Sequence, residues 1–149
     1  MMNSNDDLSQ DPALIRDFLV ESEELLQGMD QDMVALESTP GDGELLNRIF
    51  RAMHTIKGTS GFLGFDPVVR LSHRAEDVLN AARRGEAQLD RRCMDALLVA
   101  RDQLGIMLED VRQGGLKEYS LDTLIAELEE AQKPRLTPRL SANSWSRIR

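Results

Sequence analysis

The spacing of apolar residues most constrains the fold, because these residues recur every three or four positions through most of the 149-residue chain. This spacing places apolar side chains on one face of an α-helix, whereas a half-buried strand would alternate apolar and polar residues. No such alternation occurs, aromatic residues make up only 4% of the chain, and valine and isoleucine are scattered. The sequence therefore predicts an all-α protein.

Proline, glycine and capping residues divide this pattern into helices. Two predicted helices begin with an Asp-Pro pair, in which aspartate caps the helix and proline takes its first position. The fifth and shortest is expected to begin with a Ser120 cap. Short connections between amphipathic helices favour an antiparallel up-down four-helix bundle, here with an additional shorter C-terminal helix. The predicted helices span about residues 11–38, 44–64, 66–85, 90–113 and 120–128.

Charge and composition separate the two ends of the chain from this bundle, which we expect to occupy residues 11–132. Residues 1–10 are polar and acidic and are expected to be a disordered N-terminus. Residues 133–149 carry five cations and no acid, contain Pro134 and Pro138, and are predicted to form a basic linker or tail. With a net charge of −8 overall, the rest of the chain carries −13, which argues against nucleic acid as its ligand.

Nothing in the sequence predicts a membrane segment. No run approaches the roughly 18 apolar residues that a bilayer span needs, and the polar N-terminus resembles neither a signal peptide nor a transit peptide. The single Cys93 cannot form an internal disulfide and is expected to be a small buried residue. We therefore expect a cytoplasmic protein that binds no membrane.

A histidine, a lysine and two glycines share one face of the second predicted helix. His54, Lys57, Gly58 and Gly61 occupy positions i, i+3, i+4 and i+7. Each glycine inside a helix costs about 1 kcal/mol relative to alanine, so close approach of a partner is expected to offset that cost. We predict that Gly58, Gly61 and Phe62 form a docking surface. The alternative, that the helix ends at Gly58, is disfavoured because the apolar pattern continues beyond it.

The short connection centred on Phe65 predicts an antiparallel hairpin between the second and third helices. Positions equidistant from it should lie at the same level, which pairs His54 with Glu76 and Lys57 with His73. A carboxylate that accepts a hydrogen bond from Nδ1–H would leave the Nε2 lone pair of His54 nucleophilic. Lys57 would contact the oxygens of an incoming phosphoryl group. His73 either is simply exposed or joins this hydrogen-bond network.

The sequence gives little support for a metal site or for a catalytic site of its own. A metal site of His54, His73 and Glu76 would place Lys57 as a competing cation among its ligands, so we predict no metal site. The chain contains no Gly-rich phosphate-binding loop, no recognisable magnesium pair and no nucleophile elbow. We therefore expect no cofactor in this chain and no ATP binding by it alone.

Three runs in the sequence resemble one known family. Residues 54–58, 60–65 and 71–76 are similar to the N-terminal histidine phosphotransfer (HPt) domain of the chemotaxis kinase CheA, and the likeness extends over about residues 11–132. Thr59 departs mildly from the family, which often has glycine or alanine there. The resemblance implies that His54 is the phosphoacceptor and that Lys57, His73 and Glu76 form the network around it.

The same resemblance implies partners that the chain does not contain. A CheA-like kinase domain, which binds ATP and Mg, would phosphorylate His54, and an aspartate of CheY-like or CheB-like receivers would accept the phosphoryl group. The family's dimerisation element lies outside this sequence, so a monomer is expected. Two alternatives remain open: a helical interaction module without chemistry, and a stand-alone phosphotransfer protein. The likeness does not separate chemotaxis from related CheA-like pathways.

Overall fold

The computed structural model describes residues 10–134, and the whole of this part is helical apart from its connections. The predicted all-α fold is confirmed. The fifth helix is the shortest, with 11 residues, and the first is the longest, with 27. The five helices are α1 (Pro12–Ser38), α2 (Gly43–Leu63), α3 (Asp66–Arg83), α4 (Arg91–Arg112) and α5 (Asp122–Gln132).

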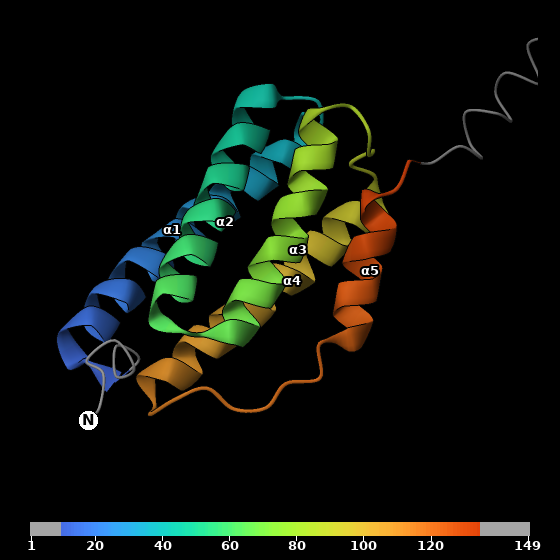
Figure 1. The fold of residues 1–149 in the computed structure, drawn as a ribbon. Helices are drawn as coiled ribbons and strands as arrows, with labels where there is room; N and C mark the ends of the chain where they lie inside the picture. The colour runs from blue at the N-terminus through green and yellow to red at the C-terminus, as the bar shows by residue number, and fades with distance from the viewer. Residues whose placement is uncertain (1–9, 135–149) are drawn as a thin grey trace, which may run out of the picture.

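Helices α1 to α4 form an antiparallel bundle, and α5 packs beside α3 and α4 (Figure 1). Each of the four bundle helices contacts its two neighbours, so α1 also packs against α4 and closes the bundle. The apolar face of every helix points into this interior, as the three-to-four-residue spacing predicts. Methionines contribute strongly to the core, and those at helical spacing are all buried: Met29, Met33, Met53, Met94 and Met107.

Aspartates cap three of the helices. The Asp11 carboxylate accepts hydrogen bonds from the backbone N–H groups of Ala13 and Leu14, and Pro12 follows it at the first helical position. Asp42 caps α2 and Asp90 caps α4 in the same manner. A side chain at this position satisfies N–H groups that have no partner inside the helix. The predicted cap at Asp11 is therefore confirmed.

The other two predicted caps are wrong by one residue. The N-cap of α3 is Phe65 and that of α5 is Leu121, and neither side chain accepts a capping hydrogen bond. Asp66 instead lies in the first turn of α3, where its negative charge favours the positive end of the helix dipole. Ser120 lies outside α5, whose first turn contains an aspartate.

The turn between α2 and α3 sets the geometry of this helix pair. Helix α2 continues through Gly58 and Gly61, so the alternative in which it ends at Gly58 is excluded. Gly64 ends the helix in the left-handed conformation, with φ of 79°. Phe65 follows immediately, is buried, and packs its ring 5.3 Å from that of Phe18 on α1. The tight turn makes α2 and α3 an antiparallel hairpin.

The two ends of the chain, residues 1–9 and 135–149, lie outside the described residues and are drawn in grey (Figure 1). The predicted disordered N-terminus and basic tail therefore stay predictions, as does the boundary of the bundle at residues 11–132. Within the described part, no helix has the length and apolar character needed to cross a membrane.

Two glycines of α2 should respond oppositely to replacement by alanine. A Cβ at Gly58 would meet no atom within 4 Å, so Gly58→Ala should raise the free energy of unfolding by about 0.5–1 kcal/mol. Gly64→Ala should lower it by about 1 kcal/mol or more, because its φ of 79° strains any residue with a Cβ. Urea denaturation of both variants measures this difference, and a loss of stability in Gly58→Ala would contradict it.

Candidate functional site

Two adjacent helices supply the residues at the centre of the candidate site. His54 lies on α2 and Glu76 on α3, and the antiparallel hairpin brings the two positions to the same level. Nδ1 of His54 contacts Oε2 of Glu76. Glu76 is buried, with 6% of its surface exposed, whereas 62% of the His54 side chain is exposed. The structure thus joins His54 to Glu76 as the spacing about Phe65 predicts.

Lys57 completes the contacts of the buried carboxylate. Its Nζ donates a hydrogen bond of 2.6 Å to Oε1 of Glu76, so each carboxylate oxygen contacts a different residue of α2. Burying a charge is costly unless it is paired and hydrogen-bonded, and here both conditions hold. Lys57 therefore neutralises Glu76 while Glu76 holds His54.

The ionisation of Glu76 decides which nitrogen of His54 carries the proton. Burial tends to raise the pKa of the Glu76 carboxyl, but hydrogen bonds from Lys57 and His54 outweigh it and hold this pKa below the usual 4.5. Glu76 is thus a carboxylate at neutral pH and can only accept hydrogen bonds. Nδ1 consequently donates its proton to the carboxylate, and in the neutral imidazole the lone pair lies on Nε2.

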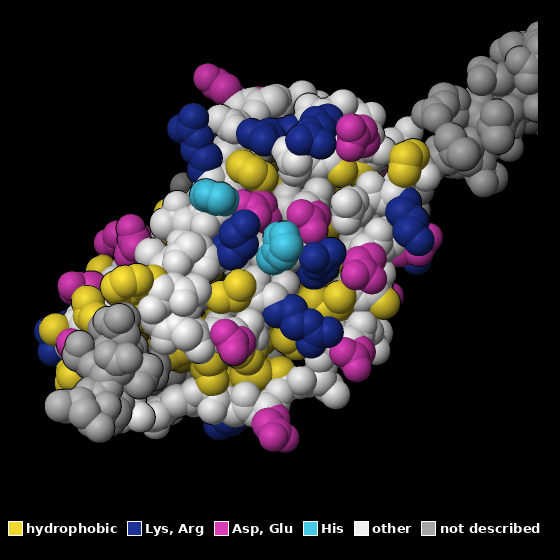
Figure 2. Space-filling view, viewed as in Figure 1, with side chains coloured by type: hydrophobic (Ala, Val, Ile, Leu, Met, Phe, Trp, Pro, Cys, Tyr) yellow, Lys and Arg dark blue, Asp and Glu magenta, His cyan; other side chains and the backbone are white. Residues whose placement is uncertain are grey.

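The Nε2 nitrogen of His54 faces the surface. It has no hydrogen-bond partner among the described residues, and the side chain that carries it is mostly exposed. Both histidines of the chain lie on one face of the molecule, over α2 and α3 (Figure 2). An incoming group can therefore reach Nε2 from outside the bundle without any rearrangement of the core.

His73 does not have the partner expected from the spacing about Phe65. Its Nε2 lies 3.7 Å from Oδ1 of Asp77, one turn along α3, and no hydrogen bond or ion pair joins it to Lys57. The spacing predicts only that the two positions share a level, and Lys57 contacts the buried carboxylate of Glu76 instead. Lys57 and His73 therefore make no direct contact, and His73 is exposed, which is one of the two alternatives expected for it.

The predicted docking residues follow His54 along α2. Phe62 exposes 65% of its surface, an unusual state for a large aromatic side chain. A Cβ at Gly58 would meet nothing within 4 Å, and one at Gly61 would meet only Cγ2 of Val69, at an ordinary 3.8 Å. Packing within the chain therefore requires neither glycine, and the surface beside His54 is open.

The sequence pattern did not single out two side chains near His54. Phe50 lies one turn before His54, and the two rings stack with centroids 6.0 Å apart. Arg83, at the end of α3, places its guanidinium 4.0 Å from the Phe50 ring centroid. Phe50 fits the three-to-four-residue apolar spacing that favours a core position, although it is only half-buried. Its four-residue distance from His54 is the signal that could have revealed it.

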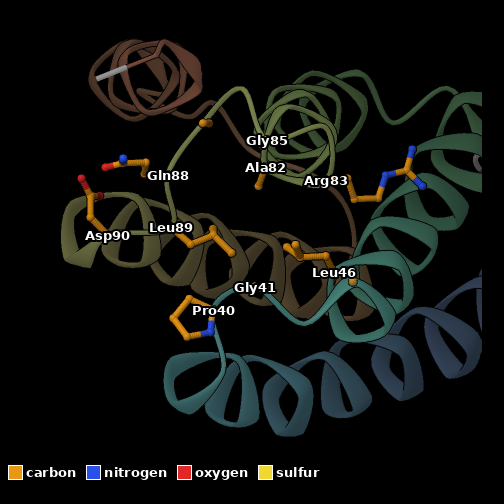
Figure 3. Close-up of a pocket in the computed structure, with 11 residues that line it drawn as sticks. Pro40, Gly41, Leu46, Ala82, Arg83, Gly85, Gln88, Leu89 and Asp90 are labelled. Carbon is orange, nitrogen blue, oxygen red and sulfur yellow. The ribbon is translucent and has the colours of Figure 1, made fainter. Parts of the chain in front are cut away.

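The candidate site is an exposed surface. It does not coincide with a cavity of about 570 Å³ at the N-terminal end of α2 (Figure 3). The residues that line this cavity come from the connections between α1 and α2 and between α3 and α4 and from the adjoining ends of α2 and α3, and they include none of His54, Lys57 and Glu76. Among the described residues, no three His, Cys, Asp or Glu side chains are grouped so that they could hold a metal ion.

Sequence comparison identifies relatives of this chain. Residues 13–114 match the Hpt domain family. The chain is 40% identical over 129 residues to the sensor histidine kinase CheAY of Helicobacter pylori, a match that covers 83% of this chain. It is 30% identical over 131 residues to the chemotaxis protein CheA of Listeria monocytogenes, covering 88% of this chain. The matches span only 16% and 21% of these two longer proteins.

Solved structures with a similar fold belong to the same class of protein as these relatives. The solution structure of the histidine phosphotransfer domain of CheA superposes with a TM-score of 0.70 at 30% identity, covering 75% of this chain and 86% of that domain. The phosphorylated P1 domain of CheA3 in complex with CheY6 from R. sphaeroides gives a TM-score of 0.74 at 25% identity, covering 80% and 95%. The chain therefore belongs to the Hpt domain family and is a histidine phosphotransfer domain of the CheA type.

Proposed function

We propose that His54 is the phosphoacceptor of this domain and passes the phosphoryl group to an aspartate of a response regulator. The observation that carries the proposal is the hydrogen bond between His54 and the ionised Glu76, which leaves an exposed lone pair on Nε2. A positioned nucleophile of this kind suits phosphoryl transfer, in which positioning and electrostatics supply most of the catalysis.

In the first step the Nε2 lone pair attacks the γ-phosphorus of ATP held by a CheA-like kinase domain. The Nε2–P bond forms, the bond from γ-phosphorus to the bridging oxygen breaks, and ADP leaves with that electron pair. No proton has to leave Nε2, because the ring proton is on Nδ1. Glu76 offsets the positive charge that develops on the imidazole, and the ammonium of Lys57, three residues along α2 from His54, would contact the phosphoryl oxygens.

In the second step an aspartate carboxylate of a CheY-like or CheB-like receiver attacks the same phosphorus. The Nε2–P bond breaks, its electron pair returns to Nε2, and an acyl phosphate forms on the receiver. The likeness to a P1 domain whose structure contains CheY6 supports this class of partner. The open surface at Gly58 and the exposed Phe62 supply the adjoining contact area for both partners.

The proposal assigns no cofactor or metal to this chain, since ATP and Mg would be bound by the kinase domain. It also treats the chain as a monomer that acts in the cytoplasm, where ATP and receivers are found. The kinase domain could belong to the same polypeptide or to another, because the relatives extend far beyond the matched region. A stand-alone phosphotransfer protein would use the same site.

Phosphorylation of His54 can be tested with a CheA kinase core and γ-labelled ATP. The wild-type chain should acquire a label that is stable to base and labile to acid, as expected of a phosphoramidate bond. His54→Gln should acquire none. His73→Gln is the matched control, since His73 is an exposed histidine on the same face whose ion pair, among the described residues, is with Asp77, and it should keep the label. Label in His54→Gln would contradict the proposal and favour a binding module without chemistry.

The role of Glu76 can be tested with Glu76→Gln, which keeps the shape but loses the charge. Phosphorylation should slow by roughly tenfold or more, a typical loss for a partner that orients a histidine. Asp77→Asn, which removes the charge beside His73 instead, serves as the control and should change the rate little. An unchanged rate in Glu76→Gln would remove its orienting role.

Glu76 should also affect stability in a pH-dependent manner. Because folding lowers its pKa below 4.5, the ionised carboxylate stabilises the native state at pH values above about 4.5, and this contribution is lost as pH falls through the folded-state pKa. Wild type should therefore be more stable than Glu76→Gln at pH 7, and the difference should shrink between about pH 5 and pH 3. Urea denaturation across this range measures it, and a difference that grows on acidification would contradict the account.

The docking role of Gly58 can be separated from its effect on the helix. Gly58→Leu should slow transfer to a receiver and phosphorylation by the kinase core, because its side chain projects from an open surface beside His54. Phosphorylation by phosphoramidate, a small donor that needs no protein docking, should stay close to the wild-type rate. Equal slowing with all three would show that Gly58 affects His54 itself rather than docking.

A further inference from the structure

Phe50 lies against the imidazole whose orientation the proposed function requires. The two residues are four positions apart on α2, and their rings are nearly parallel, with an angle of 14° between planes and 6.0 Å between centroids. Offset stacking at this separation is a favourable arrangement of aromatic rings. Phe50 is half-buried and His54 is exposed. The phenyl ring, held by its surroundings, therefore restricts the motion of an imidazole that lies mostly in solvent.

Arg83 holds the Phe50 ring from α3. Its guanidinium carbon lies 4.0 Å from the ring centroid, within the range of a cation–π contact. Asn47 and Asn80 accept hydrogen bonds of 2.7 Å and 2.8 Å from the two terminal nitrogens of the guanidinium. Figure 3 shows Arg83 at the edge of the cavity, extending away from it toward α2. The guanidinium thus links the end of α3 to the helix that carries Phe50 and His54.

A single hydrogen bond does not fix the orientation of His54. Glu76 contacts only Nδ1, and the ring can still tilt about that contact. The Nε2 lone pair lies in the plane of the imidazole, so a tilt turns it away from the direction of attack on phosphorus. Small errors in the placement of a reacting group can cost up to about 100-fold in rate. A second restraint on the plane of the ring is therefore needed, and the stacked phenyl ring supplies one.

We propose that Phe50, supported by Arg83, is a positioning residue that sets the plane of the His54 imidazole for phosphoryl transfer. This inference rests on the proposed function of His54, but it assigns a role to side chains outside the Glu76 and Lys57 contacts. Glu76 fixes the tautomer and Phe50 fixes the plane. Together they aim the Nε2 lone pair outward from the bundle.

The stack can be tested by spectroscopy without any phosphorylation. In wild type, the ring current of Phe50 should shift the carbon-bound protons of the His54 imidazole. Phe50→Leu keeps an apolar side chain and should lose this shift, whereas Phe50→Tyr keeps the aromatic ring and should retain it. Arg83→Gln, which changes an exposed side chain, should reduce the shift without unfolding the bundle. Identical His54 proton shifts in wild type and Phe50→Leu would overturn the proposed stack.

Kinetics then test whether the stack affects reactivity. Phosphoramidate transfers its phosphoryl group to Nε2 as its P–N bond breaks and ammonia leaves, so it reports on the imidazole without protein docking. Phe50→Leu should react about fivefold or more slowly with phosphoramidate and with the kinase core, with KM for the core unchanged. Phe50→Tyr should restore both rates to near the wild-type value.

Three results distinguish failure of this inference from failure of the proposed function. If Phe50→Leu slows phosphorylation by the kinase core but not by phosphoramidate, Phe50 is a docking residue. If neither rate changes, Phe50 has only a structural role. Either result overturns the positioning role. Label in His54→Gln would instead overturn the proposed function. Urea denaturation of each variant identifies any rate change that comes only from partial unfolding.

Discussion

The site depends on one buried carboxylate that is shared by two side chains of the neighbouring helix. Glu76 on α3 accepts from Lys57 through Oε1 and from His54 through Oε2. Lys57 supplies a charge that keeps Glu76 ionised in the interior, and the ionised carboxylate then fixes the proton of His54 on Nδ1. In the proposed function, the reactivity of an exposed histidine would therefore be set by a residue that solvent scarcely reaches. Without Lys57, burial would favour the protonated carboxyl and weaken control of the tautomer.

The hairpin of α2 and α3 explains how a helical bundle carries this site on its surface without disturbing the packing of its apolar core. Gly64 allows the tight turn, and Phe65 anchors it by packing against Phe18. The apolar faces of both helices remain in the interior, while the flanking positions meet at the surface and carry the polar contacts. Gly58 weakens the helix where no packing within the chain requires a glycine, and it leaves the surface beside His54 open.

Periodicity and turn chemistry predicted the five helices, and the symmetry about Phe65 predicted that His54 meets Glu76. These features could be predicted because helical spacing, an aspartate cap and a short connection each depend on residues only a few positions apart in the sequence. The partner of Lys57 was not predictable in this way, because the symmetry gives only which positions share a level, and the contact that Lys57 makes is with the buried carboxylate of Glu76. Arg83 was missed for a similar reason: its contacts with Phe50 and Asn47 join residues 33 and 36 positions apart, across two helices.

The most direct measurement of the central claim is the protonation state of the His54 ring in the folded chain. Long-range ¹H–¹⁵N correlation spectra at neutral pH distinguish the two nitrogens. We expect a protonated Nδ1 and an unprotonated Nε2 in wild type, a mixture of tautomers in Glu76→Gln, and a phosphorus coupling at Nε2 after phosphorylation. A wild-type ring with its proton on Nε2, or a phosphoryl group on Nδ1, would contradict the assignment of Glu76 as the residue that prepares His54 for transfer.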